Sequence, residues 1–456
     1  MENINNPVFI EFETKTREFK GKLLLISHLL QSGFSRIYFG ANRPLRKEAL
    51  SFRNGIYFFK SVSISEIDLY KKLKKNGFIL CLLHAEGGIY YKNSQSSIQS
   101  LFNEEALNFF DYIYVFGEKI KNDIINCNGS QLRKKIIVSG EPRFDLLKSK
   151  YENVSYKSIN KLKSQYEKFI LINTSFSASN PLIGIVKLKD YWLNEPTLTK
   201  ETRDLLMIKI DFFKIVIEHY ILAIESLARE FPTINFVLRP HPSESEAFYR
   251  EKFKGIDNII INKKGDVTDW IKASIGVIHY DCTTGIESLM ADKPVISFTP
   301  ILDDRVVAWL PTVATKNITT LSDLTLEINN IIEGRFNFEL SDDIKHHLLE
   351  TINNFLTEAS PIISSDLLNK AAILSEPLQT GHFIRHYYEI LNYNIRMWTK
   401  KIIGILKGQK NISMEKFGTI TISEIINIME EIKKSNDFKY KFHVKRHTTN
   451  SFLIKK

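Results

Sequence analysis

The chain has 456 residues, of which 43% are hydrophobic and 25% are charged, the balance of an ordinary globular protein. This length suits two or three domains, and the composition excludes a chain that is mostly disordered or glycine-rich. Three cysteines cannot form a disulfide framework and suit a reducing compartment. We expect a cytoplasmic protein, because no apolar run reaches about 18 residues and the N-terminus does not resemble a secretory signal.

The net charge of +10 is concentrated near the C-terminus. Residues 400–456 contain 13 Lys and Arg against 5 Asp and Glu, a net charge of +8, which leaves +2 for residues 1–399. A nearly neutral body lacks the basic groove typical of nucleic-acid-binding domains. A basic tail instead predicts an acidic partner, either a membrane surface or nucleic acid.

Through about residue 155 the chain alternates between short β-rich runs and helical patterns. Residues 16–30 place apolar side chains at helical spacing, and Gly33 ends this pattern. Strands separated by helices are typical of βαβ units around a parallel sheet. The expected strands are 8–12, 36–39, 56–59, 78–83, 112–116 and 135–138.

A second unit of the same kind follows a polar, helix-like linker at residues 148–168. It contains a long amphipathic helix over about 201–230, which stops before Pro232. Its expected strands are 169–173, 235–239, 258–261, 276–279 and 294–298. We therefore predict an α/β protein with two βαβ domains and a cleft between them, at 1–155 and 156–380, and a helical, basic extension at 381–456.

The extension combines apolar and basic side chains. Residues 383–407 carry an apolar stripe interleaved with Arg and Lys, which fits a helix at an anionic membrane surface. The same stripe fits a helix that packs on the N-terminal domain. Residues beyond about 407 are polar and basic enough to be partly disordered.

The most specific stretch, RPHPSE, directly follows an expected strand. Arg239 and His241 would then project at the carboxyl edge of a parallel sheet, where open α/β sheets bind ligands. Guanidinium and imidazole groups at that edge suit a phosphate. A rigid turn with a surface arginine explains the same residues about as well.

A second stretch, HYDCTTGIE, runs from a strand into a helix. Thr283, Thr284 and Gly285 lie in the connecting loop, and hydroxyls with free N–H groups at a helix N-terminus form an anion site. Glu287 would lie within the first turn, where it can accept hydrogen bonds from ribose hydroxyls. Helix capping by a threonine explains the same pattern and is compatible with the anion site.

Three further loops also follow expected strands. HAEGG supplies Glu86, either a carboxylate suited to general acid–base catalysis or a surface glutamate in a turn. GEPRFDLL supplies Asp145, either a second carboxylate at the cleft or the cap of the following helix. NTSF supplies Ser175, either a residue of the same cleft or part of a polar loop. Paired carboxylates such as Glu86 and Asp145 serve in glycoside hydrolysis, and glycosyl transfer can use them in the same way.

Several motifs are missing from the sequence. It has no Gly-x-Gly-x-x-Gly loop, no Walker-type loop, no Asp-x-Asp and no His/Cys cluster with metal spacing. A diphosphate donor commonly needs a divalent ion, whereas one phosphate can be held by His, Arg and a helix N-terminus. We therefore expect no metal and no cofactor, and a nucleoside monophosphate as leaving group.

The five segments, in the order HAEGG, GEPRFDLL, NTSF, RPHPSE and HYDCTTGIE, resemble a known family. They are similar to bacterial surface-carbohydrate biosynthesis proteins that include the retaining β-Kdo transferases of capsule and lipopolysaccharide assembly. The resemblance covers about residues 8–300. It implies a GT-B-like fold, with two Rossmann-like domains facing a cleft, and a CMP-activated ulosonic acid donor. The His-Pro pair also resembles the CMP-binding motif of bacterial sialyltransferases. The CMP site implied by this resemblance comprises Arg239, His241, Thr283, Thr284, Gly285 and Glu287, with Ser175 beside it.

The same resemblance implies catalysis by Glu86 and Asp145. If the configuration is retained, Asp145 is the nucleophile, kept ionised by Arg143, and Glu86 is the acid–base residue. If it is inverted, Glu86 alone suffices and Asp145 is structural. The expected partners are the CMP-activated ulosonic acid, a polysaccharide or glycolipid acceptor and the inner face of the cytoplasmic membrane, with no nucleic acid.

Two other functions stay open. One is a teichoic-acid-type phosphotransferase that uses a CDP-linked polyol donor. The other is a non-catalytic scaffold of polysaccharide assembly, which would keep the fold and tolerate the loss of both carboxylates.

Overall fold

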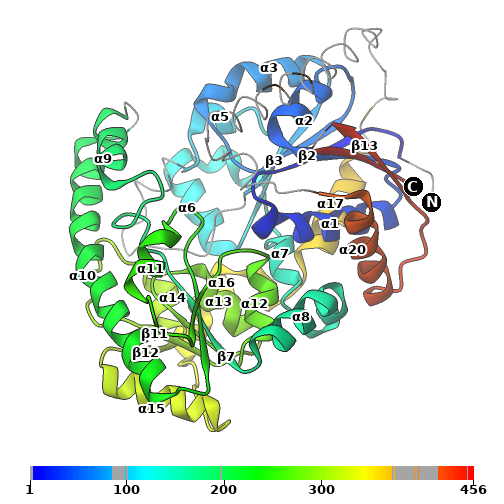
Figure 1. The fold of residues 1–456 in the computed structure, drawn as a ribbon. Coiled ribbons are helices and arrows are strands. Elements are labelled where there is room, and N and C mark those ends of the chain that lie inside the picture. Colours follow the sequence, from blue (N-terminus) through cyan, green and yellow to red (C-terminus); the bar gives the residue numbers. More distant parts are fainter. Residues whose placement is uncertain are drawn as a thin grey trace. The chain divides into compact units, whose positions relative to one another are not determined.

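The computed structural model describes residues 4–84, 98, 101–195, 198–371, 374, 395, 399, 420–448 and 450–456. They form two compact units, each built on its own sheet (Figure 1). The first unit combines the described residues up to Ser155 with those from Leu349 onward, and the second contains Tyr156–Leu348. No helix within the described ranges is both long enough and apolar enough to cross a membrane.

The first unit contains an eight-stranded sheet. Six parallel strands follow the order β2-β1-β3-β4-β5-β6, and an antiparallel hairpin extends the sheet beyond β2. The strands are β1 (Val8–Phe12), β2 (Arg36–Ala41), β3 (Ile56–Phe59), β4 (Ile79–Leu83), β5 (Tyr112–Val115), β6 (Ile136–Val138), β13 (His443–Thr448) and β14 (Ser451–Lys455).

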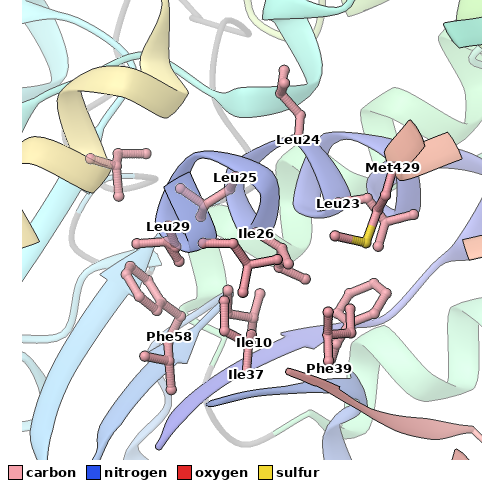
Figure 2. Close-up of a cluster of buried hydrophobic side chains, with 14 of the residues drawn as sticks. Ile10, Leu23, Leu24, Leu25, Ile26, Leu29, Ile37, Phe39, Phe58 and Met429 are labelled. Carbon is pink, nitrogen blue, oxygen red and sulfur yellow. The ribbon is translucent and has the colours of Figure 1, made fainter. Parts of the chain in front are cut away.

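Helices surround this sheet in the first unit. Helix α1 (Lys15–Gln31) contributes Leu23, Ile26 and Leu29 to a buried cluster with Ile10 and Phe58 of the strands (Figure 2). The apolar spacing of α1 therefore directs one face onto the sheet. The other helices are α2 (Asn42–Ala49), α3 (Ile67–Lys75), α5 (Glu104–Leu107), α6 (Glu118–Asn128), α7 (Pro142–Asp145), α17 (Ala359–Ala371) and α20 (Ile422–Ser435), with short 3-10 turns η1 (Ile64–Glu66), η2 (Ser130–Lys134), η3 (Ser149–Ser155) and η4 (Asn353–Phe355).

The C-terminal segment differs from the expected partly disordered tail. Helix α20 buries Ile425 and Met429 in the same cluster as α1, and Figure 2 labels Met429 of α20 and Leu23 of α1 in this cluster. Strand β14 pairs with β2, and its Phe452 and Ile454 are fully buried. The burial of one short apolar strand and one amphipathic helix thus orders this segment despite its basic charge. The stripe at 383–407 lies outside the described residues, apart from 395 and 399.

The chain re-enters the first unit before α17, so the second unit ends at Leu348 and not at 380 as expected. The returning segment lies against the carboxyl ends of β5 and β6. A Cβ added to Gly117 would lie 2.2 Å from the carbonyl oxygen of Glu350, and one added to Gly140 would lie 2.3 Å from Asn354 Oδ1. Glycine is needed at Gly117 because the backbone approaches so closely, and at Gly140 because its φ of 86° favours glycine and the Asn354 side chain fills the space.

The second unit contains six parallel strands in the order β12-β11-β10-β7-β8-β9. Numbered along the chain within the unit, this is the Rossmann order 3-2-1-4-5-6. The strands are β7 (Phe169–Asn173), β8 (Asn235–Arg239), β9 (Ile259–Ile261), β10 (Gly276–His279), β11 (Val295–Phe298) and β12 (Lys316–Ile318).

Helix α10, which runs over Lys200–Glu230, is the amphipathic helix expected near 201–230 (Figure 1). The other helices are α8 (Tyr156–Tyr166), α9 (Ile185–Asn194), α11 (Glu246–Lys252), α12 (Val267–Ala273), α13 (Thr283–Met290), α14 (Trp309–Val313), α15 (Leu321–Ile332) and α16 (Asp342–Thr351), within which the chain returns to the first unit. Two doubly wound sheets in one chain confirm the expected α/β fold class with two Rossmann-like domains.

Candidate functional site

The strand order of the second unit defines where a ligand can bind. Strand β7 is central, and the chain continues from it to β8 on one side and later to β10 on the other. The loops after β7 and β10 therefore diverge at the carboxyl edge, which is the position where open α/β sheets bind ligands. Ser175, His241 and Thr283 follow β7, β8 and β10. The structure thus brings the three predicted loops to one edge.

The loop after β7 is fastened to its neighbours by side-chain hydrogen bonds. Ser175 Oγ donates to the carbonyl oxygen of Tyr280 at 2.6 Å, which joins this loop to the loop after β10. Thr174 Oγ1 donates to Glu244 Oε2 at 2.8 Å, which joins it to the loop after β8. Asn173 is 4% exposed, and its Nδ2 has no hydrogen-bond partner among the described residues. A buried donor without a partner is rare in native proteins.

The loop after β8 presents His241 to solvent. The ring is exposed, and the Ser243 N–H donates to its Nδ1 at 3.2 Å. A ring that accepts at Nδ1 carries its proton on Nε2 when neutral, and Nε2–H is a donor suited to an anion.

Arg239 occupies a supporting position in this loop. Its Nη1 and Nη2 donate to the carbonyl oxygens of Lys264 (2.7 Å) and Gly265 (3.0 Å), and its guanidinium lies over the Trp270 ring. The side chain is 8% exposed, and burial lowers its pKa to about 10. The geometry therefore shows Arg239 bracing the neighbouring loop, whereas the sequence predicted a phosphate ligand.

Helix α13 begins at Thr283, with Cys282 as its N-cap, so Thr283, Thr284 and Gly285 lie in the helix and not in the loop where they were expected. Thr283 Oγ1 donates to Glu287 Oε1 at 3.3 Å, and Glu287 is 2% exposed. The Thr284 hydroxyl is buried without an oxygen or nitrogen partner among the described residues and interacts with the Cys282 thiol. The Gly285 N–H already donates to the carbonyl oxygen of Cys282 at 3.0 Å. The other N–H groups of the first turn have no intrahelical acceptor, and these are the donors that α13 can offer at the carboxyl edge.

Gly285 allows α13 to approach strand β10 closely. A Cβ at this position would lie 2.3 Å from His279 Nε2. His279 is fully buried, and Nε2 is 3.0 Å from Thr315 Oγ1. Burial lowers the pKa of His279 to about 3, so its ring is neutral at pH 7. Gly285 thus has a packing role that the sequence analysis did not anticipate.

His279 belongs to a row of polar side chains that crosses the sheet where the strands end. Asn173 pairs in register with Arg239 on one side and His279 on the other, and His279 pairs with Ser297. Each of these four residues lies two positions after a strand residue that belongs to one buried apolar cluster. Side chains two positions apart on a strand point to the same side, so the four polar side chains share one face of the sheet. Asn173 Nδ2, His279 Nδ1 and Ser297 Oγ are buried without partners in the described part of the chain. This polar row lies directly beneath the candidate site.

Glu244 is the residue that the sequence analysis missed. It has no exposed surface, and its carboxylate contacts both the loop after β7 and the loop after β8. Burial raises its pKa to about 7. The final glutamate of RPHPSE was visible in the sequence, but no pattern indicated what it contacts.

In the first unit, Asp145 has a different environment from the one expected of a nucleophile. It ends α7 and has no exposed surface. Its Oδ1 accepts from Asn354 Nδ2 at 2.7 Å and Ala359 N at 2.9 Å, and its Oδ2 accepts from the N and Oγ of Ser360, both at 3.0 Å. The carboxylate thus caps α17, and this geometry fits an anchor. The guanidinium of Arg143 lies over the Phe144 ring.

Glu86, the other predicted catalytic residue, lies outside the described residues. His84, two positions before it, is 4% exposed and packs against the Phe102 ring. Burial lowers the pKa of His84 to about 3. The end of β4 is therefore an apolar position in which an imidazole stays neutral.

No family model and no curated protein matches the sequence. Similar solved structures include the wall teichoic acid polymerase TagF soaked with CDPG, at 13% identity over 81% of this chain and 89% of that chain, with a TM-score of 0.46. Another is the UDP-GlcNAc 2-epimerase of Methanocaldococcus jannaschii, in complex with UDP-GlcNAc and UDP. It is 10% identical over 81% of this chain and 100% of that chain, with a TM-score of 0.47. The UDP-GlcNAc 2-epimerase of Neisseria meningitidis, bound to UDP-GlcNAc, is 13% identical over 81% of this chain and 100% of that chain, with a TM-score of 0.45. Likeness at this level concerns the fold and carries no argument about chemistry.

Proposed function

We propose that this protein is a glycosyltransferase whose second unit binds a nucleotide-activated sugar at the carboxyl ends of β7, β8 and β10. The observation that carries the proposal is the convergence of hydrogen-bond donors at the switch point of a Rossmann-type sheet. The exposed His241, the N-terminal turn of α13 and the buried amide of Asn173 all lie at this edge.

The donor groups suit one phosphate. His241 provides a switchable ring donor, and α13 provides N–H groups at the positive end of its dipole. One buried polar group, Asn173 Nδ2, has no hydrogen-bond partner among the described residues, which supports a ligand that completes it. In this proposal Ser175 lines the site, whereas Arg239, Gly285 and Glu287 do not contact the ligand and instead hold the surrounding loops and helix in place.

The proposed donor is a CMP-activated ulosonic acid, and the proposed acceptor is a hydroxyl of a surface polysaccharide or glycolipid. In the reaction the bond from the anomeric carbon to the phosphate oxygen breaks, and a bond to the acceptor oxygen forms. CMP leaves, and the acceptor proton passes to a base, for which Glu86 is proposed. The donor assignment rests on the motif resemblance together with a site that suits a single phosphate.

The position of Asp145 bears on the stereochemical outcome. A retaining reaction by two displacements needs a carboxylate nucleophile that can reach the anomeric carbon. Both oxygens of Asp145 are engaged in hydrogen bonds within a closed core. We therefore propose that Asp145 anchors α17, and that a retaining mechanism in this protein would use a different nucleophile.

A nucleotide titration tests the proposal. We expect CMP to raise the melting temperature more than CDP or UDP at equal concentration. His241→Ala should weaken CMP binding about 10- to 150-fold, because it removes a charge-assisted hydrogen bond of about 1.5–3 kcal/mol. His219→Ala is the matched control, since His219 is an exposed histidine on α10. Preference for CDP would favour the polyol-phosphate alternative, and failure to bind all three nucleotides would favour the scaffold.

For the acidic partner we propose an anionic membrane surface and assign the contact to the β13–β14 hairpin. Residues 438–456 contain six Lys and Arg and no Asp or Glu. Lys441, Lys445 and Lys455 are exposed, and the described residues provide none of them with an ion pair. Each lysine near an anionic bilayer contributes about 1 kcal/mol, so the hairpin can hold the protein at such a surface.

Charge reversal tests this contact. Lys441→Glu with Lys445→Glu should lower the affinity for phosphatidylserine-containing vesicles, measured by co-sedimentation, at least about 30-fold. Lys161→Glu with Lys163→Glu is the control, because it changes the charge equally on exposed positions of α8. Equal loss in both double variants, or none in the first, would contradict the assignment.

A further inference from the structure

Glu244 gathers four hydrogen-bond donors from three segments of the second unit. Its Oε1 accepts from the backbone N–H groups of Phe176 at 2.7 Å and His241 at 3.3 Å. Its Oε2 accepts from the hydroxyls of Thr174 at 2.8 Å and Tyr249 at 2.6 Å. Each oxygen thus contacts two donors, and Oε1 joins the loop after β7 to the loop after β8.

Backbone hydrogen bonds hold the same two loops together on either side of the carboxylate. The Leu182 N–H donates to the carbonyl oxygen of Ser243 at 2.7 Å, and the Ser245 N–H donates to that of Asn180 at 3.1 Å. The Thr174 N–H donates to the carbonyl oxygen of Arg239 at 3.3 Å. The two loops therefore form one hydrogen-bonded layer, with Glu244 buried inside it.

We propose that Glu244 is a positioning residue that holds the loops after β7 and β8 as one nucleotide-binding element, an inference that rests on the proposed function. Ser175 follows Thr174 directly, and His241 donates its own N–H to Glu244. The carboxylate thereby sets the spacing between these two ligand-facing residues. Because Glu244 has no exposed surface, it acts on the ligand only through them.

The chemistry of the site separates two substitutions. In Glu244→Gln the amide oxygen still accepts from the two backbone N–H groups, and the amide nitrogen can donate to the hydroxyls of Thr174 and Tyr249, whose protons rotate freely. The link between the loops then survives. In Glu244→Ala all four donors lose their acceptor, and nothing joins the Phe176 N–H to the His241 N–H.

Hydrogen exchange read by mass spectrometry measures the link without any ligand. In Glu244→Ala we expect exchange in residues 174–180 and in residues 241–245 to accelerate together, at least tenfold, whereas Glu244→Gln stays within about threefold of the wild type in both. Acceleration confined to residues 241–245 would overturn the proposal, because Glu244 would then influence only its own loop.

Nucleotide binding provides the second measurement, made on the full chain at a temperature where circular dichroism shows every variant folded. The CMP dissociation constant should rise at least tenfold in Glu244→Ala and at most threefold in Glu244→Gln. A lower melting temperature with an unchanged dissociation constant would overturn the proposal in favour of a purely structural role. If Glu244→Ala does not fold, Thr174→Val combined with Tyr249→Phe removes both donors to Oε2 and should weaken binding in the same direction.

The two measurements distinguish a failure of the proposed function from a failure of the proposed role of Glu244. If the wild-type protein binds none of CMP, CDP or UDP while the exchange of both loops still depends on Glu244, the loop coupling stands and the nucleotide-binding function falls. If the wild-type protein binds CMP and neither variant changes the exchange of residues 174–180, the function stands and the role of Glu244 falls.

Discussion

Replacing Asp145 distinguishes an anchor from a nucleophile. Asp145→Ala removes the common acceptor of Asn354 Nδ2, the Ala359 and Ser360 N–H groups and the Ser360 hydroxyl. Asn354 keeps its hydrogen bonds to the backbone of Glu141, but the start of α17 loses its cap. These partners of Asp145 are neutral, and leaving a buried donor without its acceptor costs about 1–3 kcal/mol, so losing several such bonds at once should cost about 3–5 kcal/mol. Asp145→Asn should cost nearly as much, because its amide nitrogen would face donors.

The rate of hydrogen exchange within α17 measures this loss of stability directly. A loss of 3–5 kcal/mol corresponds to exchange about 150- to 5000-fold faster in residues 359–371 when opening is rapid and reversible. Peptides from 276–290, in the second unit, serve as the internal reference and should not change. Asp211→Ala is the matched control, since that carboxylate is 73% exposed, and it should change stability by less than about 0.5 kcal/mol.

The opposite result would refute the reasoning. An Asp145→Ala protein with wild-type protection in α17 and no transferase activity would identify Asp145 as a reacting group. The same conclusion would follow from a sugar-sized adduct that forms from donor alone, seen by intact mass, and disappears in Asp145→Ala.

Three further predictions follow from buried contacts. Gly285→Ala should lower the free energy of unfolding by about 1–3 kcal/mol, because its Cβ would overlap the His279 ring; an unchanged urea midpoint would contradict this. Burial raises the pKa of Glu18 to about 7 from 4.5, so the folded state keeps a proton that the unfolded chain releases above about pH 4.5. Glu18 should therefore contribute a fall in stability of about 3 kcal/mol as pH rises from 4.5 to 7, and Glu18→Gln should remove that contribution, so urea titrations at several pH values should show a smaller pH dependence than for the wild type. Deleting residues 443–456 removes two strands and the buried Phe452, so the truncated protein should lose the cooperative melting of its first unit by circular dichroism.

The sequence predicted the strands of both units to within about two residues for most of them, since buried parallel strands appear as continuous apolar runs. The same reasoning located Ser175, His241 and Thr283, because a polar residue directly after such a run must lie at the carboxyl edge. Contacts between distant segments could not be predicted in this way. Asp145 meets partners 209 to 215 positions further along the chain, and β14 pairs with β2 across about 400 residues. Local pattern contains no information about such pairings, so the sequence predicted neither these contacts of Asp145 nor the C-terminal hairpin.

The insertion of the second unit between two parts of the first has a consequence during protein synthesis. Strand β2 is an interior strand only once β14 is paired with it, and β14 lies about 400 residues later in the chain. At about 5–20 residues per second, roughly 20–80 s separate the synthesis of the two strands. Throughout that interval β2 presents an open edge of N–H and C=O groups, the kind of edge on which unfinished chains associate. Nascent first units are therefore the species in which we expect chaperone dependence, whereas the second unit, continuous from Tyr156 to Leu348, can complete its sheet while translation continues.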